Sequence, residues 1–251
     1  ALWKQEERRP GVTQAAAGPA PSFRATWRTF ARQGQALRLL VALGLGTAGF
    51  AMQDIILEPY GGEILGLSVA ATTQLTALTA LGALVAFGLS SHWLGRGWDA
   101  YRLAACGALV GIPAFAAVIF AAPLDSASLF RLGAGLIGFG GGLFTVGTLS
   151  AAMALESGGL HGLVLGAWGA VQACCGGLAL GLGGTLRDAV SSLATSGHLG
   201  AALADPVTGY SFVYHLEIAL LFSTLVAIGP LVRRRPLHPP LGPQRLGALH
   251  S

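Results

Sequence analysis

Two carboxylates stand close together in a stretch that is otherwise apolar. Asp54 and Glu58 are four residues apart, so a helix places them on one face, where they repel each other unless a cation or a proton intervenes. Gln53 precedes them, and the run Pro59-Tyr60-Gly61-Gly62 follows. Carboxylates in or next to hydrocarbon are costly and usually face a protein interior or a cavity. We therefore take this stretch as the candidate site, and we expect the proline and the two glycines to end the helix and turn the chain.

The composition explains why these charges stand out. Hydrophobic residues make up 53% of the chain and charged residues 10%, and the mean hydropathy is +0.64. A soluble domain carries roughly 25% charged residues, so the sequence predicts an all-α membrane protein. Glycine supplies 38 of 251 residues, mostly inside apolar runs, which favours close helix packing in lipid. The basic residues gather at the chain ends. The sequence has no basic stripe on a soluble domain, so it does not predict a nucleic-acid partner.

The chain divides into three predicted parts. Residues 1–36 form a cytoplasmic linker, residues 37–235 a six-helix transmembrane domain, and residues 236–251 a cytoplasmic tail. The linker begins like the interior of a longer polypeptide. Within it, residues 22–35 combine an aromatic face with an arginine face, which fits either a helix lying on an anionic membrane surface or an ordinary juxtamembrane segment. The two faces consist of Phe23, Trp27 and Phe30, and of Arg24, Arg28 and Arg32.

Six apolar segments are long enough to cross a membrane. The expected spans are residues 37–57, 66–91, 103–122, 129–154, 161–185 and 211–231. Pro113 is expected to kink the third span. Of the arginines next to these spans, nine lie on one side and two on the other, which predicts that both termini are cytoplasmic. The nine are Arg24, Arg28, Arg32, Arg38, Arg96, Arg102, Arg233, Arg234 and Arg235, and the two are Arg131 and Arg187.

The two arginines on the outer side are the basic residues available to the candidate carboxylates. We expect Asp54 or Glu58 to pair with Arg131 or Arg187, and so to join the outer ends of the bundle. The alternative is that Glu58 lies in water at the outer surface. We expect such a pair to be structural and to position a docking surface rather than to move protons.

Several other sequence patterns give weaker indications of function. Two GxGxxG matches, at residues 44–49 and 133–138, lie inside expected spans, where a dinucleotide fingerprint does not belong. The histidines show no metal-pair spacing, and no nucleophile–base pair is evident, so we predict neither a metal site nor a catalytic residue. His215, near the outer surface, is a weak candidate for binding a cofactor. The spacings Gly138/Gly142 and Gly177/Gly181 permit close approach of a helix or of a flat ring.

The longest recognisable stretch is residues 52–73, Met-Gln-Asp-Ile-Ile-Leu-Glu-Pro-Tyr-Gly-Gly-Glu-Ile-Leu-Gly-Leu-Ser-Val-Ala-Ala-Thr-Thr. It resembles the signature of the PucC/LhaA family, major-facilitator-like proteins implicated in delivering bacteriochlorophyll and assembling light-harvesting complexes. Residues 135–148, 166–172 and 216–222 continue the resemblance. The family has about twelve spans in two halves, so this chain resembles the C-terminal half. Its cytoplasmic loop at residues 94–102 only partly follows the facilitator pattern.

The resemblance implies an assembly factor of a bacterial inner (intracytoplasmic) membrane. Its implied partners are lipid, light-harvesting or reaction-centre subunits, and an N-terminal six-helix half or another membrane subunit, with bacteriochlorophyll as transient cargo. The alternative is a secondary transporter of a small solute. A transporter is expected to have broken helices and polar groups at the midplane, whereas the sequence places charges in the outer third and at the ends, which favours the assembly factor.

Overall fold

The computed structural model describes residues 34–155 and 161–232 of the chain, and these residues form helices joined by short turns. The elements are α2 (Gly34–Ala51), α3 (Gln53–Glu63), α4 (Val69–Gly95), α5 (Ala100–Ala121), α6 (Ala127–Met153), α7 (His161–Thr195), the short 3₁₀ helix η1 (Ala201–Leu203) and α8 (Val207–Val232). The predicted linker and tail lie almost entirely outside the described residues, as does most of the amphipathic segment expected at residues 22–35.

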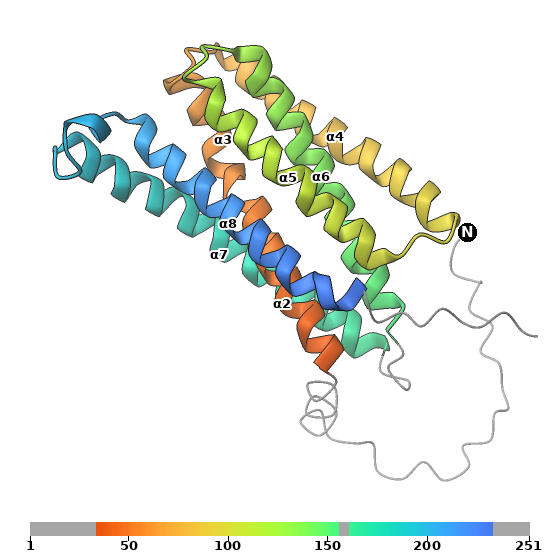
Figure 1. The fold of residues 1–251 in the computed structure, drawn as a ribbon. Coiled ribbons are helices and arrows are strands. Elements are labelled where there is room, and N and C mark those ends of the chain that lie inside the picture. The colour runs from red at the N-terminus through yellow and green to blue at the C-terminus, as the bar shows by residue number, and fades with distance from the viewer. Residues whose placement is uncertain (1–33, 156–160, 233–251) are drawn as a thin grey trace, which may run out of the picture.

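Six helical segments in the described ranges are long and apolar enough to cross a membrane. The first is formed by α2 and α3 together, and runs from Gly34 to Glu63. The prediction of an all-α protein with six spans is therefore confirmed. Figure 1 shows α4, α5 and α6 on one side of the bundle and α2, α7 and α8 on the other, with α3 continuing α2 toward one end. The relation to half of a major-facilitator bundle stays a prediction.

The prediction that Pro59 and the two glycines end the first helix is wrong. Pro59 lies inside α3, which continues to Glu63. Tyr60 is fully buried, and its ring packs against Phe130 with the centroids 5.4 Å apart. Burying such an aromatic ring stabilises the helical path, while the proline ring points to the exposed side of α3.

The chain turns a few residues later than predicted. The Ile64 N–H donates to the Tyr60 carbonyl at 3.0 Å and the Leu67 N–H to the Gly61 carbonyl at 2.9 Å, and these bonds close the helix. Gly66 follows with a φ of +61°, a left-handed conformation that glycine adopts without steric cost. Ser68 then accepts a hydrogen bond from the Ala71 N–H at 3.3 Å and starts α4.

The first span is interrupted at Met52 instead, between α2 and α3. The third span shows no such interruption, because α5 runs through Pro113 as one helix. The kink expected at that proline stays a prediction. The interruption is slight, because Met52 keeps helical dihedral angles with a φ of −60° and a ψ of −36°.

Close glycine contacts hold one side of the bundle together. A Cβ atom added to Gly138 of α6 would lie 2.0 Å from the Thr79 carbonyl oxygen of α4, and one added to Gly82 of α4 would lie 2.2 Å from the Gly135 carbonyl oxygen of α6. Gly107 brings α5 similarly close to α6, since a Cβ atom added to it would lie 2.5 Å from the Gly140 carbonyl oxygen. The backbones of α4, α5 and α6 therefore touch at positions where no other residue fits.

Candidate functional site

The signature stretch on α3 divides into faces with different surroundings. Leu57, Tyr60 and Gly61 are buried in the bundle core. Glu58 and Gly62 are exposed. The carboxylate pair of Asp54 and Glu58 faces neighbouring α4 and α6, because both residues line a groove that these helices form with the first span. The helix thus presents a packing face and a polar face, as the four-residue spacing predicts.

The groove has a volume of about 510 Å³ and lies near the middle of the bundle. Its residues on α6 fall between Ile137 and Thr145, close to the centre of that helix. The walls are Phe50, Leu57, Ala80, Ala83, Phe87 and Ile137, the glycines are Gly138, Gly141 and Gly142, and the polar residues are Gln53, Asp54, Glu58, Thr76, Thr79 and Thr145. None of these lining residues is basic.

Hydrogen bonds hold both carboxylates in place at the groove. The Gln53 Nε2 donates to Oδ1 of Asp54, and the Thr76 hydroxyl donates across from α4 to Oε1 of Glu58. Thr79 donates its own hydroxyl to the Leu75 carbonyl at 2.7 Å. Each carboxylate therefore keeps one oxygen that no other described residue engages. The groove is rich in oxygen acceptors, and its lining residues include no cation that would compensate them.

A third carboxyl group lies directly behind this groove. Glu217 of α8 is fully buried, and its Oε1 accepts a hydrogen bond of 2.6 Å from the backbone N–H of Gln53. This bond joins α8 to the first residue of α3. Among the described residues, Oε2 of Glu217 and Oε1 of Gln53 have no hydrogen-bond partner.

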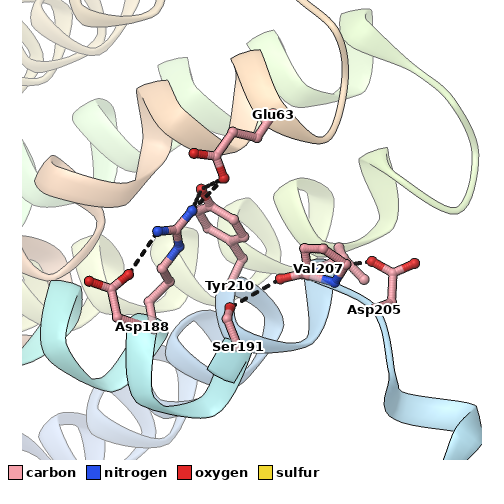
Figure 2. Close-up of polar contacts among 8 residues, drawn as sticks. Glu63, Asp188, Ser191, Asp205, Val207 and Tyr210 are labelled. Carbon is pink, nitrogen blue, oxygen red and sulfur yellow. Dashed lines mark hydrogen bonds and ion pairs between the residues drawn. The ribbon is translucent and has the colours of Figure 1, made fainter. Parts of the chain in front are cut away.

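The end of the bundle at which α3 ends carries a different kind of polar cluster, shown in Figure 2. Arg187 of α7 forms ion pairs with Glu63 of α3 and with its neighbour Asp188, the latter at 2.7 Å. Tyr210 of α8 accepts a hydrogen bond from Arg187 and donates one to Glu63 at 2.6 Å. The guanidinium carbon also lies 4.2 Å from the centroid of the Tyr210 ring. This cluster joins α3, α7 and α8.

The cluster corrects the pairing expected from the sequence. Arg187 does pair with the first span, but its partner is Glu63 rather than Asp54 or Glu58. The reason is that α3 continues past Pro59 and brings Glu63 next to α7 and α8, while Asp54 and Glu58 face α4. Arg131 has no ion pair within the described part of the chain, and lies exposed beside a shallow apolar groove of α4 and α6. Glu58 is exposed, as the alternative to the pairing allows.

The structure also places the glycine and histidine candidates in different surroundings. Gly138 and Gly142 line the groove, but α4 already occupies the space that they leave, since a Cβ on Gly142 would lie 2.8 Å from the Ala86 Cβ. They therefore serve packing between α4 and α6 before anything else. Gly177 and Gly181 on α7 face nothing within 4 Å. His215 is exposed on α8, where its Nδ1 lies 2.6 Å from the Ser211 carbonyl oxygen, and it does not line the groove.

Sequence reasoning missed four residues that contribute to these sites. Glu217 lies inside a predicted span, and an ionisable residue at that depth is a signal in its own right. Glu63 stood next to the expected turn, and the error about the turn concealed its role. Thr76 and Tyr210 gave no signal, because their partners come from distant parts of the chain.

Together the fold and the groove define a multi-pass helical membrane protein with an acidic recess near the middle of its bundle. The family of PUCC proteins matches residues 1–236, and the chain belongs to that family. The resemblance noted in the signature stretch is therefore confirmed for PucC.

Relatives from phototrophic bacteria support the assignment. The "Uncharacterized protein in puhA-bchM intergenic region" of Rhodobacter capsulatus is 48% identical over 98% of this chain and 52% of its own length. Protein PucC of Cereibacter sphaeroides is 46% identical over 93% of this chain and 50% of its own. A more distant relative, 31% identical over 80% of this chain and 46% of its own, is named "Bacteriochlorophyll synthase 44.5 kDa chain" of Rhodobacter capsulatus.

The chain spans about half the length of these curated relatives. No solved structure matches it. The comparisons thus establish a photosynthesis-related membrane protein of the PucC family.

Proposed function

We propose that this chain is part of an assembly factor for bacterial light-harvesting or reaction-centre complexes, and that it handles bacteriochlorophyll without acting as an enzyme. The groove beside α3 is the observation that carries the proposal. It combines apolar walls, which suit a membrane-soluble pigment, with a small number of fixed polar groups, which is the usual composition of a ligand pocket. Family membership supports the same function.

The proposed location is a bacterial inner (intracytoplasmic) membrane, with both termini cytoplasmic. The arginine bias of nine to two supports this orientation. It agrees with the fold, in which the start of α2, the turn between α4 and α5, and the end of α8 lie toward one end of the bundle (Figure 1).

The proposed protein partners dock on the face of α7. Glycine in a helix costs about 1 kcal/mol relative to alanine, and Gly166, Gly177 and Gly181 do not offset that cost with any close contact inside the described bundle. Such glycines are useful where another helix comes close. The partner is a second six-helix half or another membrane subunit, including a subunit of the light-harvesting or reaction-centre complex, and lipid covers the remaining faces.

A secondary transporter remains the second candidate function, and one observation favours it. The first span divides at Met52 into α2 and α3, and the polar residues Gln53 and Glu217 meet next to this point; polar groups beside an interrupted helix are typical of transporters. Asp54 and Glu217 lie beside this point, while the expectation that the charges gather in the outer third of the spans stays a prediction. The break alone does not identify a solute.

The decisive experiment is to purify the protein from a phototrophic membrane and record its absorbance. We expect bacteriochlorophyll to copurify in proportion to the protein. Purification without pigment, together with saturable uptake of a small solute by vesicles that contain the protein, would support the transporter and contradict the assembly factor.

A further inference from the structure

A fully buried carboxyl group lies where α8 meets the first span. Glu217 is inside α8, and its Oε1 accepts the Gln53 N–H at 2.6 Å. Within the described residues this is the one hydrogen bond of the carboxyl group, because Oε2 has no partner. A buried carboxylate persists as an anion when several N–H groups or a cation compensate its charge. Glu217 has neither of these in the described part of the chain, and a buried charge without compensation neutralises instead.

The charges on the neighbouring helices do not change this conclusion. Helices α2, α5 and α7 pack against α8, and none of their described arginines forms an ion pair with Glu217. The titratable groups whose charge does act on Glu217 are Asp54 of α3 and Tyr214 of α8. A negative charge on Asp54 disfavours a second one on Glu217. The three arginines are Arg38, Arg102 and Arg187.

A second buried group beside Glu217 lacks a donor. The Gln53 side chain is 4% exposed, and its Oε1 has no partner among the described residues. Its Nε2 donates to Asp54, so the amide cannot turn over without losing that bond. A buried acceptor without a hydrogen bond is unfavourable. Oε2 of Glu217 and Oε1 of Gln53 are therefore two unsatisfied acceptors on residues that already touch, and one proton on Oε2 supplies the donor that both require.

We propose that Glu217 is a proton-binding site, and that its neutral carboxyl group donates from Oε2–H to Oε1 of Gln53. The proton then gives α8 a second hydrogen bond to the first span, next to the bond with the Gln53 backbone. Its loss leaves a buried anion opposite another acceptor and removes this second bond. Proton binding is thus linked to the contact between α8 and the point where α2 and α3 meet. The proposal rests on contacts within the chain and is independent of the proposed function.

The site is connected to the groove beside α3. Gln53 and Asp54 both line that groove, and the chain of hydrogen-bonded residues runs from Glu217 through Gln53 to Asp54. The other side of Glu217 is closed by the core, since Tyr214 and Leu221 on the same helix are fully buried. The groove is therefore the side from which the proton exchanges with water, and Asp54 is the carboxylate that receives it there.

Infrared spectroscopy tests the proposal directly, because a protonated carboxyl group has a C=O stretching band apart from those of carboxylates. The unaltered protein and Glu217→Gln are purified in a detergent without carbonyl groups and compared at neutral pH. We expect a carboxylic acid band in the unaltered protein that Glu217→Gln has lost. Gln53→Leu should keep this band but shift it to higher frequency, because the hydrogen bond to the amide oxygen is gone.

The matched control is Glu63→Gln, which removes an ion-paired carboxylate at the end of α3. It should keep the carboxylic acid band and lose intensity only in the carboxylate region. Thermal unfolding provides a second readout. Glu217→Gln retains an oxygen acceptor and gains an N–H donor toward Gln53, so it should keep the melting temperature, whereas Glu217→Leu loses both bonds and should lower it.

Three results would overturn the assignment. An unaltered protein without a carboxylic acid band at neutral pH would show that Glu217 is ionised. A band that persists in folded Glu217→Gln would place the proton on another residue. If Glu217→Gln does not fold, an unshifted band in Gln53→Leu would contradict the proposed hydrogen bond. Each of these results would leave the proposed function intact, because copurification of pigment tests that function separately.

Discussion

The two sides of this bundle use glycine and charge in opposite ways. Between α4 and α6, the backbone of the neighbouring helix occupies the space beside Gly82 and Gly138. The groove that holds the carboxylates of Asp54 and Glu58 has no cation among its lining residues. On α7, Gly177 and Gly181 face open space, while Arg187 is paired with Glu63. The same residue types therefore indicate internal packing on one side and external contact on the other.

This difference identifies which features still lack a partner. Contacts within the chain itself explain a glycine whose neighbouring space is occupied by another helix, and they explain a paired arginine. Those contacts do not explain a glycine that faces empty space, which points to a partner helix. They also do not explain a carboxylate without a nearby cation, which points to a ligand. Three predictions test the comparison, in decreasing order of their effect on the stability of the chain.

The largest loss of stability is expected from Gly138→Val. The new Cβ would lie 2.0 Å from the Thr79 carbonyl oxygen, and because that atom belongs to the backbone of α4, the helices must separate. Overpacking of this kind costs about 1–3 kcal/mol or more. Thermal unfolding in detergent measures the effect, and we expect a lower melting temperature together with a lower yield.

The matched control is Gly177→Val, which makes the same change in a helix whose glycine has no neighbour within 4 Å. Its melting temperature should stay close to that of the unaltered chain. Equal losses for the two variants would mean that helix propensity, rather than close packing, decides the result.

A smaller loss is expected from Arg187→Gln. This change removes the ion pair with Glu63 and the contact with the Tyr210 ring. Partly exposed ion pairs contribute up to about 1 kcal/mol, so we expect a modest fall in the melting temperature. Added salt should reduce the difference between the variant and the unaltered chain, because it screens the pair.

Arg131→Gln serves as the control for that experiment. Arg131 is exposed and has no ion pair in the described part of the chain, so its removal should leave the melting temperature unchanged. A larger loss for Arg131→Gln than for Arg187→Gln would contradict the arrangement of the Arg187 cluster.

The smallest effect on stability is expected from the double change Gly177→Leu and Gly181→Leu. Both positions are open in the bundle, so the chain itself should fold normally. The added side chains should prevent a partner helix from approaching α7. We therefore expect copurification with light-harvesting subunits, or with a separately expressed N-terminal half, to be lost while the melting temperature is kept.

Alanine at the same two positions provides the comparison, because it adds little volume and should retain most of the association. If the leucine variant associates as well as the unaltered chain, the α7 face is a lipid surface and the proposed docking is wrong.

The sequence by itself determined the parts of this protein that depend on local patterns. Six apolar segments follow from hydropathy alone, and their number agrees with the described helices. The four-residue spacing of Asp54 and Glu58 correctly predicted a shared helix face that lines a cavity. The signature stretch also identified the family. Hydropathy and spacing are properties of neighbouring residues, which is why a single sequence reveals them.

Only the tertiary structure decided which groups meet. Glu63 and Arg187 are separated by 124 positions, and Gln53 and Glu217 by 164, so no local pattern relates them. The helix passes through Pro59 because the burial of Tyr60 by other helices outweighs the local preference to stop. The same spacing occurs in the pairs Gly138/Gly142 and Gly177/Gly181, yet another helix occupies the space beside the first pair only. The helix that occupies this space comes from another part of the chain, so the spacing alone does not reveal it.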